Sequence, residues 1–225
     1  MAGKTDEEDI YTIRVISLLT DIGRHCLLQA FLHEVPKEKS VHQYLQENDK
    51  RKILDQLLMK KIITVKQFDQ LFAEKINPEE FDFTLLYALL RYIVVQAPVT
   101  GWTSMPKDDD ISIGAALIRI RDLRNQVFHL PSKLNRDDFE DIWDELSENL
   151  KRIVRLTQGE SECEEVRKNI KELKKGKLAP KDVLDRNAHS LMQWSVADFS
   201  NISEVVQHGL VCIFYIASYI PKKIE

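Results

Sequence analysis

Cysteine, glycine and proline are scarce in this 225-residue chain, and each shortage excludes a class of structure. The three cysteines, Cys26, Cys163 and Cys212, are odd in number and far apart, so they do not resemble a disulfide framework. They predict reduced thiols in a cytosolic or nuclear compartment, and we expect a cytoplasmic protein. Neither a C-x-x-C pair nor a histidine pair at ligand spacing occurs, so we expect no metal and no cofactor. Only seven glycines and seven prolines, without long alternating apolar runs, predict an all-α fold.

An excess of positive charge is also absent, because the formal net charge is −4. The chain as a whole therefore does not attract nucleic acid, and any such site must be local. The first residues are polar and acidic, unlike a signal peptide. The longest apolar run, residues 209–220, spans about twelve residues and is too short to cross a bilayer, so we expect no membrane association.

Apolar residues recur at helical spacing along most of the chain and predict a series of helices. Gly23 lies inside the first of them and marks a weak point or a close packing contact. Thr64 and Gln67 form a capping box, and Trp102 is expected to anchor a rigid connection that contains Pro98, Gly101 and Pro106. The expected helices before that connection cover residues 7–33, 41–46 and 50–60, a short segment after Thr64, and a buried segment at 81–96.

The stretch at residues 110–131 is predicted to be one helix of five to six turns, with Asp110 as an acidic N-cap candidate and Pro131 as its stop. Arg124 falls in the middle of its apolar face, where an arginine must reach solvent, find a partner or face an anion. Asn125 and His129 lie one turn apart, which gives the pattern R-N-x-x-x-H at the helix end. The apolar face itself consists of Ile113, Ala116, Leu117, Ile120, Leu123, Val127 and Phe128.

A further helix with a clean apolar stripe is predicted at residues 137–157, and the short connection predicts that it packs antiparallel to the preceding one. The segment at 160–177 is highly charged and is interpreted as an exposed helix or tether with solvated lysines. We therefore divide the chain into a helical domain at 7–157 and a C-terminal helical extension at 158–225. The last apolar stretch either packs on the core or covers a partner surface, and its role stays open.

Several signatures in a fixed order resemble one family. They are F-D-F-T-L-L at residues 81–86, the connection with Pro98, Gly101-Trp102 and Pro106, Asp110 with Ser112, R-x-R-x-L-R-N-x-x-x-H at 119–129, and F-x-x-x-W at 139–143. Together they resemble the HEPN superfamily, and more narrowly the HEPN-like domain of the DAZ-interacting zinc-finger ubiquitin ligase. The resemblance covers residues 11–157 and implies a compact helical bundle, followed here by the C-terminal helical appendage.

The resemblance also implies a function. Catalytic members of the superfamily are metal-independent endoribonucleases that dimerise through the motif helix and act in defence or innate signalling. Carried over, the catalytic candidates are Arg124, Asn125 and His129. A histidine can serve as acid or base near neutral pH, and an arginine is a permanent fork for phosphate oxygens. Arg119 and Arg121 add local positive charge and are RNA-binding candidates.

Each candidate also has a structural interpretation. Arg124 could pair with a carboxylate of a neighbouring helix, and His129 could be a C-terminal residue favoured by the helix macrodipole. Arg119 and Arg121 could be solvated. Asp108 and Asp109, with Asp110, resemble a metal cluster but are better explained as a solvated loop and helix cap.

Two functions remain open. The first is a homodimeric endoribonuclease domain acting on single-stranded RNA. The second is a non-catalytic dimerisation or adaptor module that joins a protein partner in a ubiquitin-ligase-like or signalling assembly. The intact motif favours the first, whereas the acidic balance and the lack of a basic stripe favour the second. Ligase activity by this chain is not expected, because a RING finger needs clustered cysteine and histidine ligands.

Overall fold

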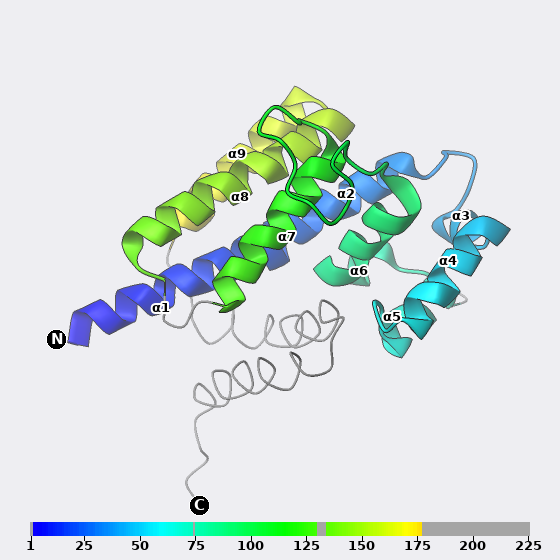
Figure 1. Ribbon diagram of the computed structural model, residues 1–225, viewed down its shortest axis with the longest axis horizontal. Helices are drawn as coiled ribbons and strands as arrows, with labels where there is room; N and C mark the ends of the chain where they lie inside the picture. Colours follow the sequence, from blue (N-terminus) through cyan, green and yellow to red (C-terminus); the bar gives the residue numbers. More distant parts are fainter. Residues whose placement is uncertain (1, 74, 130–133, 177–225) are drawn as a thin grey trace, which may run out of the picture.

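The computed structural model describes residues 2–73, 75–129 and 134–176, and within these ranges every regular element is a helix (Figure 1). The all-α prediction is therefore confirmed. The predictions for Pro131, Cys212 and the apolar run at 209–220 concern residues outside the described ranges. The elements are α1 (Ala2–Ser17), η1 (Leu18–Gly23), α2 (Arg24–Glu34), α3 (Val41–Leu45), α4 (Asn48–Met59), α5 (Val65–Phe72), η2 (Pro78–Glu80), α6 (Phe83–Leu89), η3 (Leu90–Val94), α7 (Ile113–His129), α8 (Arg136–Thr157) and α9 (Glu160–Lys175).

The N-terminal helix is interrupted at the position that the sequence predicts. A π-helical segment, η1, joins α1 to α2 and ends at Gly23. A Cβ atom at Gly23 would lie 3.0 Å from Cε2 of Phe83 and 3.2 Å from the carbonyl oxygen of Leu18. Gly23 is thus both an irregular point in the helix and the place where α6 approaches closely, which confirms the prediction.

The same helix is the one candidate membrane span among the described residues. Ile10–Glu34 is long and apolar enough to cross a bilayer, but 67% of its most apolar window is buried inside the structure. Burial of that extent is what the central helix of a helical bundle requires, because its neighbours replace water on most sides. α2 accordingly lies against both α6 and α8.

A smaller group of helices, α3 to α5, lies to one side of the bundle (Figure 1). The predicted capping box is present: the Thr64 hydroxyl accepts a hydrogen bond from the backbone N–H of Gln67. Gln67 is buried, and its Nε2 donates to both carboxylate oxygens of Asp82 at 3.0 Å. Asp82 in turn accepts from the backbone N–H of Leu85 at 2.8 Å and so caps α6. This chain of contacts fastens the small group to the start of the buried helix.

The bundle proper is built on α7 and α8, which run antiparallel as predicted (Figure 1). The stripe predicted for α8 is buried, with Trp143 as its largest member. α9 packs on α8 through buried Cys163, Val166 and Ile170, so it is a helix of the bundle with one solvated face and not a tether. The predicted boundary at residues 157 and 158 stays a prediction.

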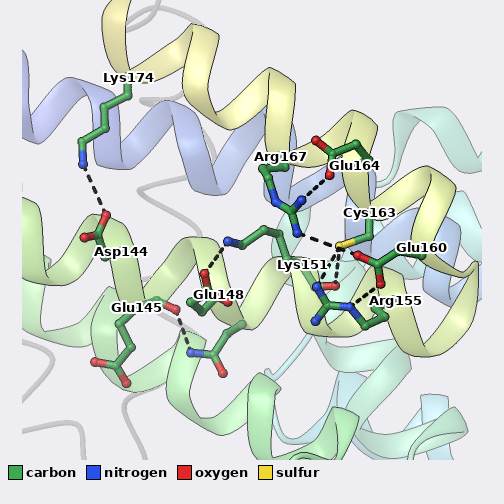
Figure 2. Close-up of polar contacts among 11 residues, drawn as sticks. Asp144, Glu145, Glu148, Lys151, Arg155, Glu160, Cys163, Glu164, Arg167 and Lys174 are labelled. Carbon is green, nitrogen blue, oxygen red and sulfur yellow. Dashed lines mark hydrogen bonds and ion pairs between the residues drawn. The ribbon is translucent and has the colours of Figure 1, made fainter.

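Polar contacts between α8 and α9 lie at the rim of this packing (Figure 2). The Lys174 ammonium lies 2.5 Å from Oε2 of Glu140 and 3.3 Å from Oδ1 of Asp144. Arg155 donates to Glu160 at 2.7 Å, and its Nη2 lies 3.4 Å from Sγ of Cys163. Exposed ion pairs of this kind contribute little individually, so the apolar face of α9 carries most of the packing energy.

Cys26 and Cys163 are free and buried. Burial raises the pKa of the Cys26 thiol to about 12, so this cysteine is neutral near neutral pH. It behaves as a small apolar core residue.

Candidate functional site

The motif helix α7 begins later than predicted. It starts at Ile113, and the Ser112 hydroxyl accepts a hydrogen bond from the backbone N–H of Ala115 at 3.2 Å. Asp110 instead accepts from the backbone N–H of Ser112 at 2.9 Å. The prediction of Asp110 as the N-cap is therefore wrong: Ser112 caps the helix, and Asp110 holds the preceding turn.

Two further observations concern Asp108, Asp109 and Asp110, the acidic residues before α7. Hydrogen bonds from the hydroxyl and then the backbone N–H of Ser112 lower the pKa of Asp110, and the positive charge of Arg119 acts in the same direction. Among the described residues, no group of three or more His, Cys, Asp or Glu side chains is arranged to hold a metal ion. Asp108 and Asp109 thus take no part in such a cluster.

Arg119 is one of the few charged side chains in the core, with 8% of its surface exposed. Its Nη1 donates to the carbonyl oxygen of Asp110 at 2.9 Å, and its Nη2 donates to that of Lys107 at 2.6 Å. The backbone N–H of Asp110 also donates to the Lys107 carbonyl, so the guanidinium closes a turn that is already hydrogen-bonded. The alternative of a solvated Arg119 is therefore wrong. Its RNA-binding role stays a prediction.

Arg121 points to another part of the same connection. It is half-buried, and its Nη1 donates to the carbonyl oxygen of Trp102 at 3.3 Å. The Trp102 ring is partly buried against the core, which confirms the predicted packing anchor. The Arg91 guanidinium carbon, from η3, lies 5.4 Å from the centroid of that ring. Arg121 thus contacts the backbone of Trp102, and Arg91 contacts its ring.

Gly114, in the first turn of α7, is a third point of close approach. A Cβ atom there would lie 2.8 Å from the carbonyl oxygen of Gln96 and 2.9 Å from Cδ of Pro98. Only glycine allows the start of the connection to lie this close to the helix. The connection between η3 and α7 is therefore bound to α7 at its start, middle and end.

Arg124 lies where its place in the pattern predicts. It is half-buried on α7, between Ile120, which is fully buried, and Val127, which is 9% exposed. Its side chain takes part in an interaction within the structure, so the arginine is not free. This is the outcome expected for a charge on an apolar face.

Asn125 is half-buried and follows Arg124 directly. Its Oδ1 is buried, and no hydrogen-bond donor contacts it within the described part of the chain. His129 is the last residue of α7, one turn beyond Asn125, and its side chain lies outside the described structure. The structure thus places the backbone of the R-N-x-x-x-H motif on the last turns of one unbroken helix.

Two residues of this region were not singled out from the sequence. Gly114 carried a signal, because a glycine in the first turn of a helix gives up helix propensity and often marks a close contact. Arg91 also carried one, because it is the only charged residue between Asp82 and Gln96 in an otherwise apolar helix. Its position over the Trp102 ring accounts for its presence there.

A family model described as DZIP3/hRUL138-like HEPN matches residues 38–183, which is more than half of the chain. The match includes α7 with the whole R-N-x-x-x-H motif, and it extends past α8 to include α9. No curated protein and no solved structure matches the chain.

Proposed function

This chain belongs to the DZIP3/hRUL138-like HEPN family, and from that premise we propose that it is a metal-independent endoribonuclease domain. In this proposal it acts on single-stranded RNA as a homodimer formed through α7, in defence or innate signalling. The observation that carries the proposal is the placement of Arg124, Asn125 and His129 on the last turns of one continuous helix.

The state of Asn125 supports this proposal. A buried carbonyl oxygen without a donor is unfavourable, by about 1–3 kcal/mol, so the group needs an explanation that a bound partner would supply. Because Oδ1 is an acceptor, it suits the ring N–H of His129 or the 2′-OH of RNA better than a phosphate oxygen, which is itself an acceptor. Asn125 would then orient the histidine or the attacking hydroxyl.

The proposed reaction is transfer of the phosphodiester within the RNA strand. The 2′-OH attacks the adjacent phosphorus, a base accepts its proton, and the bond to the 5′-oxygen breaks as that oxygen receives a proton from an acid. In this scheme His129 from each of two protomers fills one proton role, and Arg124 stabilises the charge on the phosphate oxygens. The products are a 2′,3′-cyclic phosphate end and a free 5′-OH end.

One set of observations favours the alternative, a non-catalytic dimerisation or adaptor module. α8, which packs on α7, carries a row of exposed acidic residues. These residues would repel RNA that approaches α7 from the side of α8. Arg119, buried and hydrogen-bonded to the connection, is not placed to offset that charge. The acidic residues are Asp137, Asp138, Asp141, Asp144, Glu145 and Glu148.

The test incubates the purified full chain with mixed single-stranded RNA in EDTA, beside Arg124→Ala and His129→Ala. Gln126→Ala is the matched control, because Gln126 is exposed on the same turns of α7. Circular dichroism and thermal unfolding first establish that all four proteins fold.

We expect the parent and the Gln126→Ala variant to cleave, leaving cyclic phosphate ends. The other two variants should be slower by roughly 10²-fold or more, since each lacks a group that acts in the transition state. If the folded parent leaves RNA intact at concentrations where it is dimeric, the nuclease proposal is wrong. The adaptor function then takes its place.

A further inference from the structure

The connection from Val95 to Ser112 is held to α7 by the packing of Pro98 against Gly114 at its start and by arginine hydrogen bonds at its middle and end. Three of its apolar side chains face solvent: Val99 is 97% exposed, Ile111 is 62% exposed and Met105 is 52% exposed. These residues therefore contribute little burial energy to hold the segment in place. Its position depends on Trp102 and on the arginines that contact this residue and the turn before α7.

The two ends of the connection are fixed independently of RNA. At its start, Gln96 and Pro98 lie against Gly114, and at its end the buried Arg119 holds the Lys107 and Asp110 carbonyls. Arg119 is only 8% exposed and both its Nη atoms donate to backbone carbonyls, so in this inference its part is to hold the turn before α7.

The middle of the connection is fixed differently. Trp102 is held at its carbonyl by Arg121 from α7 and at its ring by Arg91 from η3. Arg91 also lies 4.9 Å from the ring centroid of Tyr92, and its Nε is buried without a hydrogen-bond partner in the described structure. Its guanidinium therefore acts on the Trp102 ring as a flat, cationic surface.

Arg121 connects this cluster to the motif. It lies one helical turn, about 6 Å along the axis, before Asn125 and about 12 Å before His129. Positions four apart share a face of the helix, and helical side chains lean toward the helix N-terminus. The Trp102 segment is thus tied to the face of α7 that carries Asn125, on the N-terminal side of that residue.

We propose that Arg121 and Arg91 are positioning residues, which hold Trp102 on the face of α7 that leads to Asn125, as one wall of the RNA site. This inference rests on the proposed function and refines it. Arg121 acts through the backbone it holds and does not bind phosphate itself. Its loss displaces the wall and weakens RNA binding, while the groups that carry out proton transfer stay in place.

The experiment uses the full chain and the variants Arg121→Ala, Arg121→Lys and Arg91→Ala. Arg167→Ala is the control, because it removes the same charge from an exposed arginine on α9. The experiment measures amide hydrogen exchange of residues 98–106 without RNA, and kcat and KM for cleavage of a labelled single-stranded RNA. Affinity for the same RNA is measured by fluorescence anisotropy.

We expect Arg121→Ala and Arg91→Ala to speed exchange at 98–106 and to raise KM and Kd by about tenfold each, with kcat within about twofold of the parent. Arg121→Lys should recover most of the loss, since an ammonium can still donate to the Trp102 carbonyl. Arg167→Ala should change none of these quantities.

Two results would overturn the inference while the proposed function stands: unchanged exchange in Arg121→Ala, or faster exchange with unchanged KM and Kd. A lower kcat at constant KM would also overturn it, because that pattern indicates direct action on the reacting groups. If the parent neither binds nor cleaves RNA, the proposed function is wrong, and the inference about Trp102 fails with it.

Discussion

Both halves of α7 carry arginines, but the contacts of the polar side chains differ between the two halves. In the first half, Arg119 donates to two backbone carbonyls and Arg121 to one, so these arginines serve the fold. In the second half, Arg124 is half-buried on the apolar face and Asn125 keeps a buried oxygen without a donor. The first half thus contributes to stability, whereas the second half carries a polar group, the Asn125 side chain, that stability alone does not explain.

The role of an arginine therefore follows from the groups that its guanidinium contacts. Backbone carbonyls from a connecting segment make a guanidinium structural, because they use donors that must otherwise be solvated. The comparison predicts that substitutions of Arg119 and Arg121 lower stability, whereas loss of the Asn125 side chain changes activity with little cost in stability.

The largest effect is expected for Arg119→Ala. The substitution removes two charge-assisted hydrogen bonds and leaves the carbonyls of Lys107 and Asp110 without this donor, so unfolding should become easier by about 2–3 kcal/mol. Chemical denaturation measures the change, with Arg167→Ala as an exposed control. A loss no larger than that of the control would mean that the buried guanidinium does not hold the turn.

The sign of the stability change in Gly114→Ala tests whether the connection is held close to α7. In an open helix position, alanine would stabilise by up to about 1 kcal/mol relative to glycine. Here the new methyl group meets Gln96 and Pro98, so we expect a net destabilisation of about 1–3 kcal/mol. A higher melting temperature for the variant would show that the connection moves away from α7 at little cost.

Asn125→Ala should separate stability from function. It removes a buried oxygen that has no donor and replaces asparagine with a better helix former, so the free energy of unfolding should stay constant or rise by up to about 1 kcal/mol. RNA cleavage should fall at the same time. If the variant is clearly less stable, Oδ1 has a structural partner, and the contrast between the two halves of α7 disappears.

The smallest effect concerns pH and Asp110. Its pKa is lowered in the folded protein from the ordinary value of 3.8, so the stability it contributes is present above that value. That stability is lost as the pH falls below 3.8 and through the folded pKa. Asp110→Asn should therefore flatten the pH dependence of stability in this acid range, as measured by thermal unfolding from pH 5 to pH 2. An unchanged slope would show that the turn does not depend on the carboxylate.

Much of the fold followed from local patterns. The capping box at Thr64 and Gln67, the close contact at Gly23 and the antiparallel packing of α7 and α8 were all predicted, and the structure confirms them. The capping box depends on neighbouring residues and the packing on a short connection, whereas at Gly23 only the glycine itself was visible in the sequence and not its contact with Phe83. α9 was harder to place, because its three buried side chains are separated by charged residues and resemble a solvated helix.

The same distinction between local patterns and distant contacts applies to the candidate site. The spacing of Arg124, Asn125 and His129 on one helix was evident from periodicity alone, as was the position of Arg124 on the apolar face. The partners of Arg119 and Arg121 were not, because they are backbone carbonyls in a connection 9 to 19 residues away. Any residue type can supply a carbonyl, so no sequence pattern marks them.

The helical architecture, the family and the order of the motif follow from the amino-acid sequence, since these depend on periodicity, caps and residue identity. The backbone groups that Arg119 and Arg121 hold are visible only in the folded protein. These contacts depend on where the connection from Val95 to Ser112 lies, and its position is set by a glycine contact, a ring contact and two guanidinium groups acting together. Burial and hydrogen-bond satisfaction arise from the assembled bundle, and no single helix specifies them.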